Sequence, residues 1–124
     1  MTDTLTDAAA DAFVASWLAA WNAHDVDAIA AHYADDVEYH SPFVAEVVGG
    51  PGHLEGIEAV RAYVASGLQR FTDLHFDPPS LVGVGAHSLS MVYRSVNDLT
   101  AVETLVLGPD GKVTLALCHY RAEG

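Results

Sequence analysis

Large apolar side chains in the first part of the chain recur at helical spacing. Phe13, Trp17 and Trp21 follow one another at intervals of four residues, which places them on one face of a helix expected over residues 6–23. The pattern returns on a smaller scale in HDVDAIAAHYADD, where an aspartate at the start is a favourable N-cap. A second helix, with Tyr33 on its buried side, is therefore expected to follow the first.

The apolar spacing then changes from helical to alternating. VEYHS, residues 37–41, alternates with a period of two and indicates a strand that ends before Pro42, because proline has no N–H for a strand ladder. FVAEVVGGPGHLEG, residues 43–56, is punctuated by glycine and proline and is expected to be a loop. A third helix is expected from about residue 57 to residue 71.

Only strands are expected after the third helix, at about residues 74–84, 86–96, 99–107 and 112–121. The turn residues Asn97-Asp98 and Pro109-Asp110-Gly111 fit antiparallel hairpins. This order predicts an α+β fold, with three N-terminal helices packed on one face of a curved, mostly antiparallel sheet.

Composition narrows the class of protein. The chain has 124 residues and is 51% hydrophobic, which predicts one domain over residues 1–124 with enough apolar material for a core. Its 17 acidic and 5 basic residues give a net charge of −12, which disfavours nucleic acid and anionic membrane surfaces as partners. The single cysteine cannot form an internal disulfide, and no basic segment precedes the first apolar stretch. A cytoplasmic protein with no membrane span is expected.

Three stretches, WNAHDVDAIAAHYADDVEYHSP, GIEAVRAYVASGL and GPDGKV, carry a resemblance to a known family. In this order of elements, the chain resembles the nuclear transport factor two-like superfamily over about residues 8 to 121, and within it ketosteroid isomerase and the SnoaL-like polyketide cyclases. The resemblance implies a cystatin-like cone, in which a bent sheet wraps round a long helix and leaves a deep apolar pocket. The scaffold hosts isomerases, cyclases, dehydratases, epoxide hydrolases and non-catalytic proteins.

The resemblance assigns roles to individual positions. The aspartate that shuttles the proton in ketosteroid isomerase falls on Ser41, and a serine is no general base without an activating partner. A first-helix tyrosine of the isomerase falls on Trp17 and a third-helix tyrosine on Val64, whereas a second-helix tyrosine is kept as Tyr33. The protonated aspartate of its oxyanion hole falls on Glu103, in the apolar strand LTAVETLVL. Burial there would raise the pKa of Glu103 and make it a donor or an acid.

Strand alternation predicts which side chains face this pocket. Tyr39 and Ser41 share one face of the first strand and His40 lies on the other; the resemblance turns the Ser41 face inward. By the same alternation, the last strand directs Ala116, Cys118 and Tyr120 to the pocket and His119 behind it.

The register of the central hairpin decides the state of Glu103. A two-residue turn at Asn97-Asp98 would place Val92 and Arg94 opposite the face that carries Glu103, so that Arg94 could hold Glu103 ionised. It would also turn an apolar set outward, and a homodimer is expected to cover that set: Leu89, Met91, Tyr93, Val102, Thr104 and Val106.

Candidate site residues fall into three groups. The catalytic candidates are Glu103, Ser41, Tyr33 and Tyr39. The alternative candidates are His40, His119 and Arg94, and the two histidines would enter the pocket if the register differed by one residue. The expected pocket wall comprises Trp17, Phe43, Tyr63, Ala101, Ala116, Cys118 and Tyr120. The seven histidines have no metal-ligand spacing, so no metal and no cofactor are expected.

Two functions remain open on these residues. The first is a cofactor-free acid/base enzyme of the cyclase, isomerase or dehydratase kind, acting on an apolar oxygenated small molecule such as a polyketide, a terpenoid or a steroid-like compound. The second is a non-catalytic ligand-binding or dimerisation module of the same fold. A Glu103 enclosed by apolar side chains favours the enzyme, and a Glu103 in a surface salt bridge favours the module.

Overall fold

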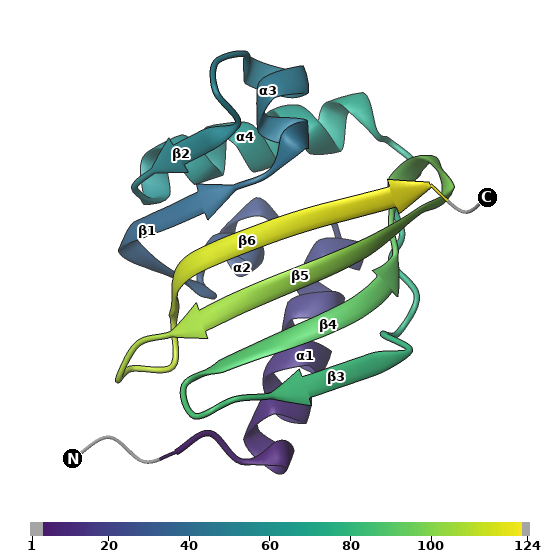
Figure 1. Cartoon of the computed structure of the whole chain (residues 1–124). Coiled ribbons are helices and arrows are strands. Elements are labelled where there is room, and N and C mark those ends of the chain that lie inside the picture. Colours follow the sequence, from purple (N-terminus) through teal and green to yellow (C-terminus); the bar gives the residue numbers. More distant parts are fainter. Residues whose placement is uncertain (1–3, 123–124) are drawn as a thin grey trace.

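The computed structural model describes residues 4–122 and has helices packed against one face of an open, six-stranded sheet (Figure 1). The strands run in the spatial order β2-β1-β6-β5-β4-β3. In chain order the elements are α1 (Asp7–Asn22), α2 (Val26–Ala30), β1 (Tyr33–His40), α3 (Pro42–Val48), β2 (His53–Glu55), α4 (Ile57–Arg70), β3 (Leu81–Val84), β4 (Ser88–Arg94), the 3-10 helix η1 (Val96–Asp98), β5 (Leu99–Leu107) and β6 (Val113–Ala122). None of the helices within residues 4–122 is long and apolar enough to cross a membrane.

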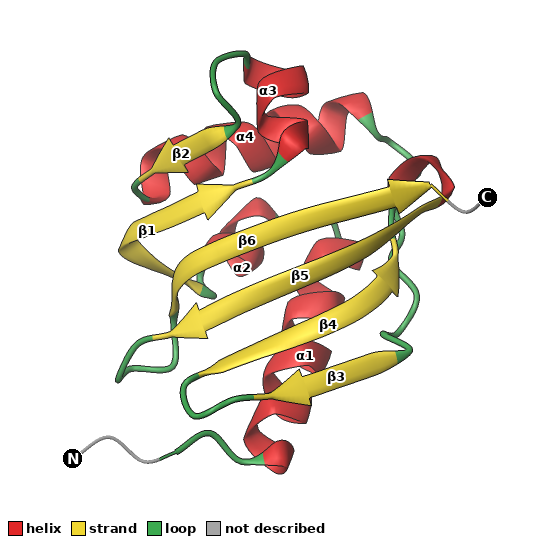
Figure 2. Ribbon diagram, viewed as in Figure 1, coloured by secondary structure: helices red, strands yellow, loops and turns green. Residues whose placement is uncertain are grey.

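The sheet is mixed, because β1 pairs parallel with β6 and every other neighbouring pair is antiparallel. Figure 2 shows α1 behind the lower strands, with α3 and α4 near β1 and β2. The predicted α+β class and the mostly antiparallel sheet are confirmed. The core lies between this sheet and the helices.

Helix α1 confirms the first prediction almost to the residue. Thr6 caps it, since Thr6 Oγ1 accepts a hydrogen bond of 3.1 Å from the Ala9 N–H. Val14, Trp17 and Trp21 form its buried stripe. Burial of this stripe, more than local propensity, holds such a helix in place.

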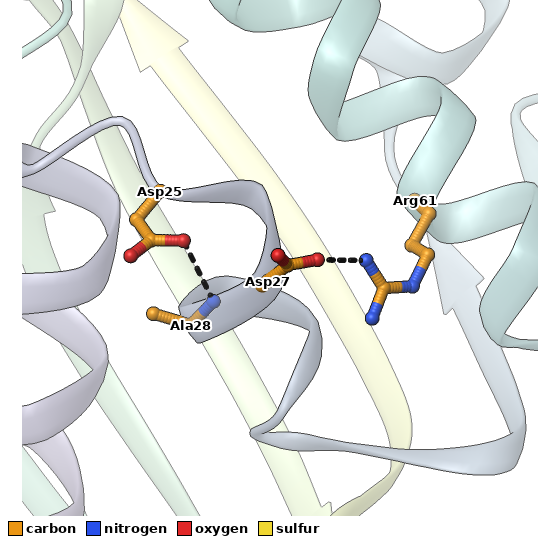
Figure 3. A network of polar contacts seen from close by, with 4 residues as sticks. All are labelled: Asp25, Asp27, Ala28 and Arg61. Atoms are coloured by element: carbon orange, nitrogen blue, oxygen red, sulfur yellow. Dashed lines mark hydrogen bonds and ion pairs between the residues drawn. The ribbon is translucent and has the colours of Figure 1, made fainter.

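Helix α2 is shorter than predicted. Asp25 caps it by accepting a hydrogen bond of 3.1 Å from the Ala28 N–H, and Asp27 joins it to α4 through an ion pair of 2.6 Å with Arg61 (Figure 3). The helix ends at Ala30, and Tyr33, expected on its buried side, instead begins β1. Pairing with β6 explains the difference, because a strand partner satisfies the backbone groups that a longer helix would have used.

The segment expected to be a loop, residues 43–56, contains helix α3 and the edge strand β2. Ser41 caps α3 by accepting a hydrogen bond of 3.2 Å from the Phe43 N–H, and Pro42 occupies the first turn. A serine followed by proline is a helix-start signal. The apolar residues of FVAEVV therefore predict a short helix better than a loop.

The strand expected at residues 74–84 forms only at Leu81–Val84. The preceding segment instead packs on α1, where Asn22 makes two hydrogen bonds to the Phe76 backbone, of 2.9 Å to its oxygen and 2.7 Å from its N–H. Pro78 and Pro79 lack the N–H groups that a longer strand would need.

The register of the β4–β5 hairpin differs by one residue from the prediction. The Ser95 N–H donates to the Leu99 carbonyl oxygen at 2.8 Å, so three residues, Val96–Asp98, make the turn. Met91, not Val92, therefore lies opposite Glu103. A shift of one residue exchanges the two faces of a strand.

Two predictions about β4 are consequently wrong. Leu89, Met91 and Tyr93 were expected outside, but they are 1%, 0% and 4% exposed and belong to the core. Arg94 was expected on the face of β4 that meets the Glu103 face, where it could pair with that carboxyl group, but it lies opposite Thr100 on the outer face and forms an ion pair of 3.7 Å with Asp98.

The outer face of the sheet is still rich in apolar residues, although its members differ from the predicted set. The register places the following apolar side chains on it: Leu81, Val92, Val102, Val106, Leu115 and Leu117. Leu81 and Val102 are 64% and 40% exposed.

Candidate functional site

A pocket opens between the helices and the inner face of the sheet. Its lining consists of Trp17, Trp21, Tyr39, Phe43, Val47, Tyr63, Val64, Gly67, Phe71, Leu74, Phe76, Tyr93, Ser95, Val96, Glu103 and Tyr120. Nine of these sixteen residues are aromatic, and the described lining has one carboxyl group and no basic side chain. The space between the atoms, including the open mouth, is about 490 Å³, of which the centre of a water molecule can reach about 40 Å³. In this conformation the pocket is therefore a narrow cleft, with a cavity volume of about 40 Å³.

Glu103 is the carboxyl group of this pocket. Strand β5 directs it inward between Met91 and Cys118, and it is only 2% exposed. Tyr93 Oη donates a hydrogen bond of 2.7 Å to its Oε1, whereas Oε2 has no hydrogen-bond partner among residues 4–122.

Burial raises the pKa of Glu103 to about 7, because the ionised form loses its hydration. Interactions with Tyr93 and Cys118, and the charge of His119, oppose this rise. Arg94 lies opposite Thr100 on the outer face, where it forms an ion pair with Asp98. Glu103 is thus a buried carboxyl group near half-protonation at neutral pH.

A group of hydroxyls lies on the β1 and β6 side of Glu103. The pKa of the Tyr39, Tyr63 and Tyr120 hydroxyls is raised, first by burial and then by neighbouring Cys118. The Ser41 side chain acts in the opposite direction on Tyr63 and Tyr120. These phenols stay protonated at neutral pH and are available as hydrogen-bond donors.

Two tryptophans of α1 close the other end of the pocket. Trp17 Nε1 donates a hydrogen bond of 3.2 Å to Tyr33 Oη. Trp21 Nε1, one helical turn later, is buried and has no hydrogen-bond partner within residues 4–122. Phe76 packs on both indoles, stacked on Trp17 with ring centroids 5.8 Å apart and tilted against Trp21 at 5.6 Å.

Several predicted site residues do meet at this pocket. Trp17, Tyr39, Phe43, Tyr63, Tyr120 and Glu103 line it. Tyr33 and Ser41 are 2% and 3% exposed and lie just behind the lining, where Ser41 Oγ caps α3. Ala101, Ala116 and Cys118 are buried on the same inner face without lining the pocket.

The alternative candidates lie elsewhere. His40 is on the outer face, stacked on His53 with ring centroids 4.7 Å apart and 3.7 Å from the carboxylate of Glu38. His119 is exposed, and its Nδ1 hydrogen-bonds the Val102 oxygen at 3.0 Å. Both therefore point away from the pocket, as strand alternation predicts.

Sequence reasoning missed three prominent wall residues, Trp21, Phe76 and Tyr93. Tyr93 was placed outside by the register error, although the alternation of β4 contained the correct signal. Its residues Leu89, Met91 and Tyr93 are large and apolar, whereas Ser88, Ser90 and Arg94 on the other face are polar. Phe76 was assigned to a strand, and Trp21 was expected to be core or pocket wall without being named among the site residues.

Metal ligation receives no support from the described part of the chain. Within residues 4–122, no three histidine, cysteine, aspartate or glutamate side chains are grouped so that they could hold a metal ion.

Known structures resemble this fold closely. A SnoaL-like protein of unknown function from Burkholderia thailandensis is 40% identical, with a TM-score of 0.90, and the match covers 97% of this chain and 100% of that one. A protein of unknown function with a cystatin-like fold from Methylobium petroleophilum is 15% identical, with a TM-score of 0.75 over 98% of this chain and 81% of that one. The epoxide hydrolase/cyclase-like enzyme SalBIII, with a role in pyran ring formation in the polyether salinomycin, is 21% identical, with a TM-score of 0.71 over 90% and 89% of the two chains.

A comparison with curated proteins found no match. The family model of the SnoaL-like domain matches residues 14–119, which is most of the chain. Together with the 40% identical structure, this match shows that the chain belongs to the SnoaL-like family.

Proposed function

We propose that the protein binds an apolar, oxygenated small molecule in this pocket and that Glu103 acts on it as a general acid. The chemistry would be cofactor-free and of the cyclase, isomerase or dehydratase kind. The observation that carries the proposal is the Glu103 carboxyl group, which is buried, lines the pocket and keeps one oxygen without a partner in the described chain.

The pocket wall supports an apolar ligand. Its aromatic side chains offer flat apolar surface, and polar groups enter at only a few points. A polyketide, terpenoid or steroid-like compound has this character. The relation to a cyclase-like enzyme of polyether formation is consistent with a substrate that carries reactive oxygen atoms.

The surroundings of Glu103 support a role as an acid. Tyr93 occupies Oε1, so the proton of the neutral form belongs on Oε2, where it can pass to a carbonyl, hydroxyl or ether oxygen of the substrate. The raised pKa keeps a large fraction of the carboxyl protonated near pH 7. After transfer, the ionised Glu103 would take a proton back from the product or from water.

Authentic ketosteroid isomerase activity is expected to be absent or feeble. Ser41 stands at the position of the isomerase base, and its oxygen is engaged in capping α3. An absorbance assay with a Δ5-3-ketosteroid tests this expectation, and robust conversion would contradict it.

Glu103→Gln tests the proposed function. Glutamine keeps the size of the side chain and can accept the Tyr93 hydrogen bond, but it has no acidic proton to transfer. We expect it to abolish the turnover of any substrate identified from a panel of polycyclic ketones, phenols and epoxides, with the fold intact by circular dichroism. The exposed Glu58→Gln is the matched control. Turnover retained by Glu103→Gln would refute the role.

A non-catalytic ligand-binding or dimerisation module is the second candidate. Two observations favour it. Ser41 stands where ketosteroid isomerase has its base, and the cavity volume of the pocket is small, about 40 Å³. This candidate would be supported if a ligand bound without being turned over and bound equally well to Glu103→Gln.

We also propose a homodimer formed through the outer face of the sheet. The apolar side chains of this face continue across β3, β4, β5 and β6, and water is an unfavourable neighbour for such a surface. The acidic residues Glu38 and Glu55 lie to one side on β1 and β2, where each is paired with a histidine. A net charge of −12 argues against nucleic acid and an anionic membrane surface as the partner. A cytoplasmic location fits this proposal.

A further inference from the structure

Two buried polar atoms of the pocket lack hydrogen-bond partners. Among the side chains of residues 4–122, the buried nitrogen and oxygen atoms without a partner are Trp21 Nε1 and Glu103 Oε2. Both residues line the same pocket, and Trp21 is only 7% exposed. A buried N–H without a partner has lost its hydrogen bond to water, and a bound group that accepts from it would restore that bond.

Trp17 provides the internal comparison. It lies one helical turn before Trp21 on the same face of α1, but its N–H is already used by Tyr33 at 3.2 Å. Trp17 is therefore satisfied by the protein and Trp21 is not. The two indoles line the same pocket with different hydrogen-bonding states.

The Trp21 indole and the Glu103 carboxyl group serve one polar region. Both act on Tyr33: the charge of Glu103 raises the pKa of its hydroxyl, and a hydrogen-bonding interaction with the Trp21 side chain lowers it. Tyr33 Oη thus lies near both groups, although only Trp17 meets hydrogen-bond geometry with it.

The Trp21 ring is held in place by its neighbours. Phe76 packs against it at 5.6 Å, and the Phe76 backbone is bonded on both sides to Asn22, the residue after Trp21. Trp17 also packs against it, with centroids 6.1 Å apart, so that the three rings contact one another. A donor fixed in this way loses little conformational entropy when a ligand binds.

We propose that Trp21 is a specificity-determining residue whose indole N–H donates to the ligand, so that the pocket selects flat apolar molecules with a carbonyl oxygen between Trp21 and Glu103. This inference rests on the proposed function, because it places a ligand in that pocket. A carbonyl oxygen has two lone pairs and accepts from the indole and from the protonated carboxyl together. A hydrocarbon of the same shape leaves both groups unpaired and is disfavoured.

A matched pair of probes tests the proposal. 1-Indanone and indane have nearly the same shape and differ in one carbonyl oxygen. Isothermal titration calorimetry at pH 6 should show at least tenfold tighter binding of indanone to the unmodified protein. Trp21→Phe removes the N–H and keeps an aromatic ring; it should weaken indanone about tenfold, or about 1.4 kcal/mol, and change indane little.

Trp17→Phe is the control for the loss of an indole ring. Its N–H bonds to Tyr33, so the variant should affect the two probes alike. Glu103→Gln separates the inference from the proposed function. If this variant has no turnover but still binds indanone more tightly than indane, Trp21 remains the group that selects the carbonyl. Turnover that survives in that variant, with selection lost in Trp21→Phe, would refute the acid and support the inference.

A second measurement does not depend on a stable variant. The unmodified protein has two tryptophans, so its ¹⁵N spectrum contains two indole N–H signals. Indanone, but not indane, should shift one of them strongly downfield. Equal affinities for the two probes, no saturable binding of either, or two unmoved indole signals would overturn the proposal.

Discussion

Glu103→Gln is expected to remove the link between stability and pH that one buried carboxyl group creates. Burial raises the pKa of Glu103 from 4.5 to about 7 in the folded protein. Tyr93 and Cys118, together with the charge of His119, lower it only in part. In the unfolded chain the same group is hydrated and has its ordinary pKa.

This difference determines the sign of the effect. Between pH 4.5 and about 7 the folded protein binds the proton more tightly than the unfolded chain, so unfolding releases it. The stabilisation linked to this proton is complete below the unfolded pKa and is lost as the pH rises through the folded pKa. The unmodified protein therefore carries a buried, unpaired negative charge at pH 8.

The magnitude follows from the two pKa values. One pKa unit corresponds to about 1.36 kcal/mol, so the full shift is worth about 3 kcal/mol, of which about 2.5 kcal/mol falls between pH 5 and pH 8. Glutamine is neutral at both pH values. The free energy of unfolding of the variant, relative to that of the unmodified protein, should rise by this amount from pH 5 to pH 8.

Urea unfolding, followed by the fluorescence of the two buried tryptophans, measures this difference. Both proteins are compared at the same concentration, because a dimer makes stability depend on concentration. The exposed Glu58→Gln is the control and should show a far smaller dependence on pH. A difference between Glu103→Gln and the unmodified protein that stays constant from pH 5 to pH 8 would refute the reasoning.

Three further substitutions test other parts of the structure. Asn22→Ala removes both bonds to the Phe76 backbone; we expect a loss of about 2 kcal/mol in urea unfolding and faster hydrogen exchange at the Phe76 amide, and unchanged exchange would contradict this. Ser41→Ala removes the α3 cap and should cost about 1 kcal/mol by the same assay, against a few tenths for Ser41→Gly. Leu117→Lys on the outer face should give a monomer in light scattering; a persistent dimer would exclude this face.

Much of the fold could be read from local patterns. Helix α1 was predicted because large apolar residues recur every four residues up to Trp21, and the structure adds a capping threonine at its start. Alternation within one strand places Tyr39 and His40 on opposite faces, and the resemblance turned the Tyr39 face inward, as the structure shows. The resemblance to ketosteroid isomerase indicated Glu103, a carboxyl group that stands out in an apolar strand.

The remaining features depend on contacts between distant segments. One backbone hydrogen bond, from Ser95 to Leu99, makes the β4–β5 turn three residues long and turns Tyr93 inward, where its hydroxyl meets Glu103. Turn residues do not specify this length, and a change of one residue exchanges the faces of a strand.

The sequence by itself determined the fold class and the buried face of α1, because each follows from periodicity, and the resemblance to ketosteroid isomerase pointed to the carboxyl group at position 103. Only the tertiary structure decided that Arg94 and Glu103 lie on different faces of the sheet and that Trp17, but not Trp21, finds a hydrogen-bond partner in the described chain. Trp17 and Trp21 look alike in the sequence, since they share one helix face. What separates them is the geometry at Tyr33, sixteen residues from Trp17 along the chain, because packing places its hydroxyl in hydrogen-bond geometry with the Trp17 N–H but not with the Trp21 N–H.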